Sequence, residues 1–260
     1  MKTLPVTAPV LPWGLPPQTM TLADDEVHVW RAVLDQPPSQ VQSFLHTLDA
    51  EEQARAKRFR FEQDRQHFIA ARGVLRDILG GYLNRAPASL AFCASPQGKP
   101  ALTVEPDRPA IRFNLSHSQG TALYAIARGR EVGIDLERIR SDLAIDEIAE
   151  RFFSRREVAM LRRLPADVRC QAFFLCWTRK EAYLKARGDG LSLSLDQFDV
   201  SLVPGEPAAL LGTRHDPADV SRWSIQELAP APGYAAALAV EGRGYRLACW
   251  QWPGPRPQSS

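Results

Sequence analysis

Hydrophobic and polar positions change their spacing along the first half of the chain in a regular order. Residues 25–34 alternate between apolar and polar side chains, which is typical of a β-strand. Residues 40–60 and 64–83 have helical periodicity instead, with apolar side chains three or four positions apart. Two strand-like stretches joined by turn residues follow at 90–102 and 111–128.

The second half has the same order of elements. Residues 131–139 alternate like a strand, and residues 144–163 and 168–187 have helical spacing. Strand-like stretches then follow at 198–203, 222–228, 234–240 and 245–252. No repeat of individual residues accompanies this order. The pattern predicts an α+β fold of two similar halves packed against each other, with the groove between them as the place to look for a ligand.

We therefore expect four regions. Residues 1–20 are rich in proline and are predicted to be a flexible arm, and residues 253–260 a frayed tail. Residues 21–128 form the N-terminal subdomain, and residues 129–252 the C-terminal subdomain with the candidate metal site.

The composition narrows the class of protein. A net charge of +2 is too small for an obligate nucleic-acid binder, although it leaves room for a local basic patch. No run approaches 18 apolar residues, and the N-terminus lacks the continuous apolar segment of a signal peptide. The four cysteines have no C-x-x-C spacing, which argues against a zinc site or a disulfide framework. We expect a reduced, cytoplasmic protein.

The segment "VGIDLE" carries two carboxylates on one face of a predicted strand. Alternation places Asp135 and Glu137 side by side, opposite the apolar side chains. Two carboxylates this close repel each other unless a cation neutralises them, and oxygen ligands suit Mg²⁺ or Mn²⁺. An ordinary exposed strand face is the alternative.

The segment "CWTRKEAYLKA" is unusual for its lysines. The chain has five lysines against 27 arginines, yet Lys180 and Lys185 lie within six residues of each other, on either side of Glu181. Glu181 and Lys185 share one stripe of a helix, so Glu181 can supply a third carboxylate and the lysines can bind phosphate oxygens. The alternative is a surface ion pair between Glu181 and Lys185, for which either type of cation would serve.

Two further segments contain candidate ligands for an anion. Lys99 follows Gly98 in the turn signal "SPQGKPAL", which places it on a loop. "FNLSHSQG" clusters an amide, hydroxyls and a histidine that can hydrogen-bond a phosphate. Ser116 or Ser118 as a hydrolase nucleophile is the rival interpretation, but no G-x-S-x-G elbow surrounds either serine.

The motifs "FNLSHS", "VGIDLE", "RFFSRREVAML" and "WTRKEAYLKARGDGLSLSLDQFDV", in this order, closely resemble the 4′-phosphopantetheinyl transferases, specifically the larger two-subdomain, Sfp-like type that activates surfactin synthetase and related synthases. The resemblance implies a monomer with a pseudo-twofold pair of α/β subdomains and coenzyme A in the groove between them. It implies transfer of phosphopantetheine from coenzyme A to a serine of an apo acyl or peptidyl carrier protein, with Mg²⁺ (or Mn²⁺) as the cofactor and adenosine 3′,5′-bisphosphate as the second product. Neither nucleic acid nor a membrane is an expected partner.

The resemblance also implies a role for individual residues. Glu181 is the candidate general base, with a water as the alternative, and Lys185 is the candidate group that stabilises the leaving phosphate. The metal ligands would be Asp135, Glu137 and Glu181. The coenzyme A contacts would be Arg55, Arg72, Gly98, Lys99, Pro100, Ser116, His117, Lys180 and Lys185.

Three other functions remain open from the residues alone. A metal-dependent phosphoesterase would use the same carboxylates with water as nucleophile and would hydrolyse coenzyme A without an acceptor. A non-catalytic coenzyme A or nucleotide-binding protein is the second alternative. Nucleic-acid binding by the arginine-rich residues 55–76 is the third, although interspersed acidic residues favour a solvated helix there.

Overall fold

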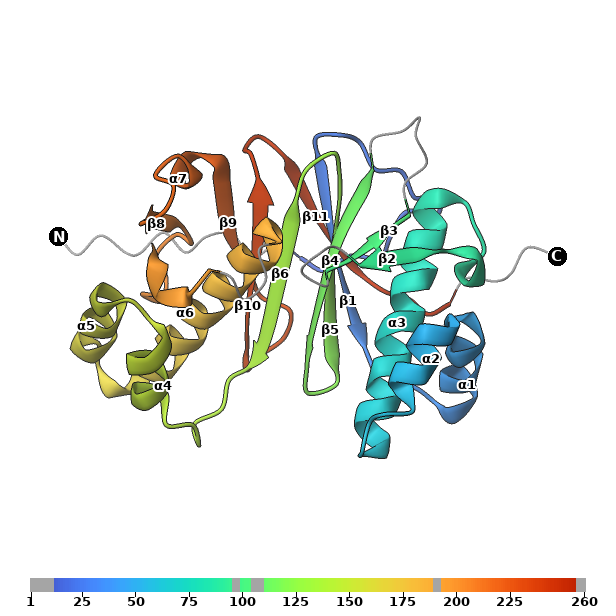
Figure 1. The fold of residues 1–260 in the computed structure, drawn as a ribbon, viewed down its shortest axis with the longest axis horizontal. Helices are drawn as coiled ribbons and strands as arrows, with labels where there is room; N and C mark the ends of the chain where they lie inside the picture. The colour runs from blue at the N-terminus through green and yellow to red at the C-terminus, as the bar shows by residue number, and fades with distance from the viewer. Residues whose placement is uncertain (1–11, 95–98, 104–109, 189–192, 256–260) are drawn as a thin grey trace.

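The computed structural model of the chain describes residues 12–94, 99–103, 110–188 and 193–255, and Figure 1 shows their arrangement. The first half contains β1 (Glu26–Val33), α1 (Pro38–Thr47), α2 (Ala50–Ala56), α3 (Glu62–Leu83), the 3₁₀ helix η1 (Pro87–Ser89), β2 (Phe92–Ala94), β3 (Pro100–Leu102), β4 (Ile111–Ser118) and β5 (Thr121–Arg128).

The second half contains β6 (Val132–Arg138), α4 (Ile145–Phe152), α5 (Arg155–Arg163), α6 (Ala166–Arg187), the 3₁₀ helix η3 (Leu195–Gln197), β7 (Phe198–Val200), β8 (Leu210–Thr213), α7 (Asp219–Arg222), β9 (Trp223–Leu228), β10 (Tyr234–Glu241) and β11 (Arg246–Gln251). These bounds confirm the predicted strands and the two long helices, α3 and α6. The predicted helical stretches at 40–60 and 144–163 are each divided into two helices, α1 with α2 and α4 with α5. β8 and α7 were not predicted, because four-residue elements are too short to show a period.

The same strand order occurs in both halves. β1 pairs antiparallel with β5 and β5 with β4, while β6 pairs antiparallel with β10 and β10 with β9. In each set of three strands, the first along the chain therefore pairs with the last. The final strand, β11, was expected in the C-terminal subdomain, residues 129–252. It pairs in parallel with β1 instead and completes the sheet of the first half.

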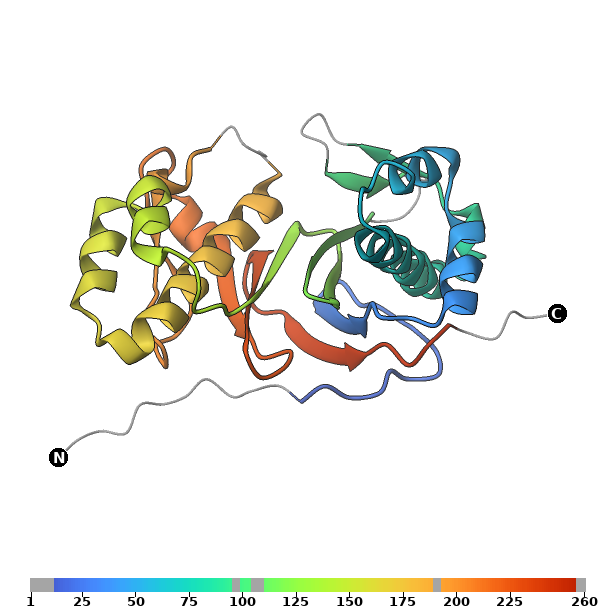
Figure 2. The same ribbon diagram turned by 90° about the horizontal axis from the view of Figure 1, so that it is seen from below.

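The two sheets pack on each other through one face and hold helices on the other (Figures 1 and 2). Alternation along β6 turns Val132, Ile134 and Leu136 toward the core shared by both sheets. The opposite faces carry α3 on the first sheet and α6 on the second, each a helix of 22 residues with its own hydrophobic core. β4 and β6 lie between α3 and α6 in both views.

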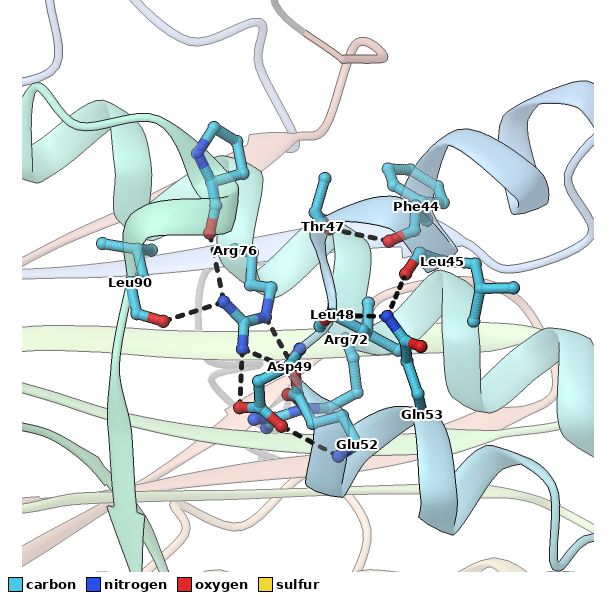
Figure 3. A network of polar contacts seen from close by, with 11 residues as sticks. Phe44, Leu45, Thr47, Leu48, Asp49, Glu52, Gln53, Arg72, Arg76 and Leu90 are labelled. Atoms are coloured by element: carbon cyan, nitrogen blue, oxygen red, sulfur yellow. Dashed lines mark hydrogen bonds and ion pairs between the residues drawn. The ribbon is translucent and has the colours of Figure 1, made fainter.

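A buried arginine ties the helices of the first half together (Figure 3). Arg76, on α3, is fully buried and donates from Nε to Glu52 Oε2 at 2.8 Å and from Nη2 to Asp49 Oδ2 at 2.9 Å. Its Nη1 atom donates to the carbonyls of Pro87 (3.1 Å) and Leu90 (2.9 Å), at the two ends of η1. Asp49 and Glu52 also form the capping box that begins α2. We call this arrangement the Arg76 clasp.

A lysine makes the equivalent clasp in the second half. Lys180, on α6, is fully buried and its Nζ atom lies 2.7 Å from Glu157 Oε2. It donates to the carbonyls of Leu195 (2.7 Å) and Phe198 (2.6 Å), at the two ends of η3. Glu157 forms a capping box with Ser154 at the start of α5, as the S-x-x-E pattern within "RFFSRREVAML" indicates. The two halves therefore contain a similar arrangement of contacts, made by different residue types, that the linear sequence did not reveal.

Part of the predicted flexible arm is attached to the second half of the chain. Gly14 donates from its amide to the Cys249 carbonyl at 3.0 Å and accepts from the Gln251 amide at 2.7 Å. The Trp13 indole donates to the Ala229 carbonyl at 2.8 Å. Residues 12–14 thus extend the edge beside β11 rather than forming a free arm. None of the described helices has both the length and the apolar character needed to cross a lipid bilayer.

Replacing Arg76 by methionine should lower the free energy of unfolding by about 3–5 kcal/mol, because it removes the fully buried cation of Glu52, leaves only Arg72 to pair with that carboxylate, and takes the donor from the Pro87 and Leu90 carbonyls. Arg65→Met is the matched control, since Arg65 forms only an exposed ion pair with Glu62 and should cost less than about 1 kcal/mol. Urea-induced unfolding measures both, and equal losses would contradict the structural role of the Arg76 clasp.

Candidate functional site

The site lies where β4 runs beside β6. The amides of Ile134, Leu136 and Arg138 on β6 donate to side chains of β4 rather than to its backbone. Their respective acceptors are Asn114 Oδ1 (2.8 Å), Ser116 Oγ (3.3 Å) and Ser118 Oγ (3.1 Å). The motif "FNLSHS" therefore joins the two sheets, a role that sequence reasoning missed. We call this contact the β4–β6 junction.

Helix α6 approaches β6 closely enough to bring its side chains to this junction. A Cβ atom at Gly133 would collide with the Ala182 carbonyl and the Ala186 backbone of α6, so glycine is required for the contact. This packing places Lys185 against the strand: its Nζ atom lies 2.6 Å from Asp135 Oδ1 and 3.2 Å from Ser116 Oγ.

Asp135 is the most buried carboxylate of the site, with 4% of the residue exposed. Its Oδ1 atom accepts from Lys185 and, at 3.0 Å, from the Ser116 hydroxyl. Its Oδ2 atom is buried and has no hydrogen-bond partner among the residues that the structure describes. An unsatisfied carboxylate oxygen at this depth is costly to the fold and is suited to a ligand that supplies positive charge.

The other two carboxylates respond to the charge of Asp135. Burial raises the pKa of Glu137, and the Asp135 charge raises it further, against a hydrogen bond of 3.1 Å from the Ser118 hydroxyl. Burial and then the Asp135 charge also raise the pKa of Glu181, while Lys185 opposes the shift. The structure thus brings the three predicted metal ligands close enough for their negative charges to interact. Their mutual repulsion favours protonation or a bound cation.

His117 follows Ser116 on β4 and faces the start of α3. Part of the residue is open to solvent, but the surrounding protein removes enough hydration from the ring to lower the pKa of His117, and the charges of His67 and Lys185 lower it further. His67 lies on α3, where its Nε2 atom is 2.7 Å from Asp35 Oδ1. The His117 ring is therefore biased toward its neutral form.

At the other end of the junction lies a cavity of about 230 Å³. Lys99, whose pKa burial lowers, lies 3.2 Å from Glu131 Oε2, and Arg112 lies 3.1 Å from Glu131 Oε1. The cavity is lined by Lys99, Pro100, Ala101, Ile111, Arg112, Phe113, Glu131, Arg187 and Gly188. Three of these charged residues, Arg112, Glu131 and Arg187, were not predicted. The alternation of side chains was a usable signal for Arg112 and Glu131, because each lies on the same strand face as residues that were predicted.

The remaining predicted residues differ in position. Arg55 is exposed, with its guanidinium 5.3 Å from the centre of the Phe68 ring. Arg72 forms an ion pair with Glu52 and stacks at 4.8 Å on Phe92. Gly98 lies outside the described residues. The structure does not bring Arg55 and Arg72 to the three carboxylates.

Lys180 requires a correction. The predicted contact between Lys180 and a phosphate of coenzyme A does not agree with its position, because the ammonium is fully buried and its three donors are used by Glu157, Leu195 and Phe198. Lys180 is a structural residue of α6. Ser116 is similarly engaged, since its hydroxyl already contacts Asp135, Lys185 and the Leu136 amide.

The donors present fit a divalent cation in their chemistry. The unpartnered Oδ2 atom of Asp135 and two further carboxylates with raised pKa values form an all-oxygen set of the type that binds Mg²⁺. The Oδ1 atom of Asp135 is paired with Lys185, whose Nζ atom lies 2.6 Å away. Over the described ranges, no three His, Cys, Asp or Glu side chains are already arranged so that they could hold a metal ion.

Comparison with known proteins places this chain in a family. Residues 131–239 match the model of the 4′-phosphopantetheinyl transferase superfamily, and residues 34–128 match that of the 4′-phosphopantetheinyl transferase N-terminal region. The chain is 45% identical to the 4′-phosphopantetheinyl transferase HetI of Nostoc sp., over 92% of this chain and 98% of that protein. The chain belongs to the 4′-phosphopantetheinyl transferases.

Two other relatives agree with this assignment. A putative 4′-phosphopantetheinyl transferase of Synechocystis sp. is 34% identical over 76% of this transferase and 77% of its own length. The 4′-phosphopantetheinyl transferase Sfp of Bacillus subtilis is 28% identical over 82% of this chain and 91% of its own. The resemblance seen in the four sequence motifs is confirmed.

Glu137→Gln should raise the melting temperature of the metal-free transferase at pH 7.5. A carboxylate whose pKa is raised in the folded state stabilises the fold only when protonated, so this contribution is lost as the pH rises through the folded pKa. The neutral amide avoids that loss and can still accept from Ser118. The gain should vanish at pH 4, near the ordinary glutamate pKa of about 4.3.

Thermal melting in the presence of a chelator, at both pH values, measures this effect. Glu51→Gln, at an exposed carboxylate, is the control and should change little at either pH. A gain from Glu137→Gln that is equal at both pH values would contradict the electrostatic origin.

Proposed function

We propose that this transferase moves the 4′-phosphopantetheine group from coenzyme A to a serine hydroxyl of an apo acyl or peptidyl carrier protein, releasing adenosine 3′,5′-bisphosphate. The observation that carries the proposal is the set of three carboxylates beside Lys185, at the β4–β6 junction. Such a set suits a diphosphate substrate, because it can hold a cation against phosphate oxygens while the lysine contacts them directly.

Asp135, Glu137 and Glu181 would hold Mg²⁺, or Mn²⁺ in its place. When bound, the cation would neutralise the charge that develops on the diphosphate as its P–O bond breaks. The fit of these residues rests on the unpartnered Asp135 oxygen and on the raised pKa values of the two glutamates.

Glu181 is the candidate for accepting the proton of the attacking serine. Its raised pKa makes it a stronger base than an ordinary glutamate, which favours proton transfer near neutral pH. A water held at the same carboxylates is the alternative acceptor. Lys185, which already bridges Asp135 and Ser116, would exchange these contacts for an oxygen of the leaving phosphate and stabilise its charge.

The nucleotide end of coenzyme A would occupy the cavity beside Lys99. Lys99, Arg112 and Arg187 bring three positive charges to its wall against the one carboxylate of Glu131, and Pro100 would shape the pocket for the base. The same role is proposed for Gly98, which lies outside the described residues. His117, Arg72 and Arg55 are proposed for further contacts with coenzyme A, with Arg72 first exchanging its contact with Glu52. Ser116 would act mainly by holding Asp135 and Lys185 in place.

The repeated strand order and the paired clasps of Arg76 and Lys180 support a pseudo-twofold relation between the halves, with the groove at their junction. A doubled architecture of this kind would let one chain build the whole site, so we propose a monomer. A cytoplasmic location and the absence of nucleic-acid or membrane partners also remain proposals.

Intact mass spectrometry of a purified apo carrier protein tests the function. Incubation with the transferase, coenzyme A and Mg²⁺ should add one phosphopantetheine to the carrier. Glu181→Gln should reduce the rate at least about 100-fold, because it removes several kcal/mol of charge stabilisation. Glu51→Gln is the matched control and should keep the rate.

Each alternative outcome is informative. Coenzyme A that breaks down without modifying any carrier would favour a phosphoesterase. An unchanged rate in EDTA or with Glu181→Gln would exclude the carboxylate site from the reaction.

A further inference from the structure

Arg187 is the last residue of α6, and it reaches the cavity beside Lys99 from the second half of the chain. Lys99 and Arg112 line the same cavity from the first half, and both pair with Glu131. Among the described residues of the cavity wall, Arg187 is therefore the cation that the second half contributes. Its guanidinium contacts a different carboxylate, Asp219 of α7.

Asp219 begins α7 and is almost fully buried, with 2% of the residue exposed. Its Oδ2 atom accepts from the Tyr183 hydroxyl at 2.6 Å and from Nη1 of Arg187, and His215 Nε2 lies 3.3 Å away. Its Oδ1 atom accepts from the Trp223 indole at 3.1 Å. Burial by itself would raise the pKa of Asp219, but the hydrogen bond from Tyr183 and the charge of Arg187 outweigh burial and lower it. A buried negative charge thus faces the guanidinium.

Tyr183 holds the same guanidinium from the helix side. It precedes Arg187 by four residues, so both side chains lie on one stripe of α6. Nη1 of Arg187 donates to the Tyr183 hydroxyl at 3.1 Å, and the guanidinium carbon lies 5.7 Å from the centre of the Tyr183 ring. The ring is itself fixed by Phe198 and Trp223, with ring centres 4.8 and 5.9 Å away. We call the contacts of Tyr183 and Asp219 with Arg187 the Arg187 clamp.

The clamp changes what Arg187 can do in the cavity. A long arginine side chain that moves freely loses rotamer freedom when it binds an anion, and this loss weakens binding. An arginine that is already held loses less. The guanidinium has five N–H donors in a planar fork, so one held at Nη1 can present other donors to an anion.

We propose that Asp219 is a positioning residue, which holds Arg187 at the cavity wall to bind an anionic group at the nucleotide end of coenzyme A. The inference rests on the proposed function, because that function brings coenzyme A to this cavity. Tyr183 supports the same position from α6. Asp219 is not among the described residues of the cavity wall, so it acts through the guanidinium of Arg187.

Calorimetric titration with coenzyme A, and with the product adenosine 3′,5′-bisphosphate, tests the proposal without turnover. Arg187→Ala should raise Kd for both ligands at least about tenfold, because a charge-assisted contact is lost. Asp219→Asn should raise both values about threefold to tenfold, since the amide lacks the negative charge that holds the guanidinium. In the Arg187→Ala background, the same Asp219→Asn change should alter Kd by less than about twofold.

Asp199→Asn is the matched control. Asp199 lies on β7 in the same half and pairs at 3.3 Å with Arg214, which is not among the described residues of the cavity wall. This control should leave Kd for both ligands within about twofold of wild type.

Tyr183→Phe is a second variant, which keeps the aromatic ring and removes only the hydroxyl. It should raise Kd for both ligands about twofold to fivefold, because it removes one contact of the clamp and leaves Asp219 in place. Tyr183→Phe replaces Asp219→Asn in the comparison if melting shows that the latter is unfolded.

Several results would overturn the proposal. One is an unchanged Kd in Asp219→Asn, and another is an equal rise in the Asp199→Asn control. A rise that persists at full size in the Arg187→Ala background would show that Asp219 supports the fold and does not act through Arg187. A wild-type protein that binds neither ligand would also overturn it.

Mass spectrometry of the carrier separates this inference from the proposed function. Coenzyme A binding that depends on both Arg187 and Asp219 supports the positioning role even if no carrier gains mass. A carrier that gains mass while neither substitution changes Kd overturns the positioning role and leaves the proposed function standing.

Discussion

The β4–β6 junction is the contact on which the rest of the site depends. Two strands that run in parallel would ordinarily share a backbone ladder, but here the amides of β6 donate to Asn114, Ser116 and Ser118. Side-chain acceptors satisfy the edge of β6 and join the two sheets at once. The same serine hydroxyls then donate to Asp135 and Glu137, so one set of residues both closes the fold and orients the carboxylates.

A rigid frame is needed to hold these carboxylates together against their repulsion. The Lys180 clasp ties α6 to α5 and η3, and Gly133 allows α6 to rest directly on β6. Because the frame fixes α6, Glu181 and Lys185 remain beside Asp135 although burial and like charge oppose the ionised forms of the glutamates. The site therefore holds unfavourable negative charge, which protonation or a bound cation would relieve.

The cavity beside Lys99 meets this site at one end of the β4–β6 junction. Lys99, Arg112 and Arg187 line its wall, and Glu131 lies 3.2 Å from Lys99 and 3.1 Å from Arg112. An anionic ligand that bound there would compete with the Glu131 carboxylate for these two cations.

The sequence by itself determined the elements, the family and the three carboxylates, because each depends on local spacing. Periods of 2 and 3.6 identified most strands and helices, and alternation put Asp135 and Glu137 on one face. The capping box of Ser154 and Glu157 was likewise visible as a local pattern and is present. Four motifs in fixed order were enough to indicate the transferase family that the comparisons confirm.

Only the tertiary structure decided the roles that depend on distant partners. Lys180 and Lys185 are five positions apart on one helix, yet one is buried with Glu157 and two carbonyls while the other reaches Asp135. The scarcity of lysine in the sequence could not distinguish a buried lysine from one that reaches the site, since burial depends on what packs against each face of α6. The pairing of β11 with β1 and the repeat of the Arg76 and Lys180 clasps were hidden for the same reason: both join segments that are far apart in the chain.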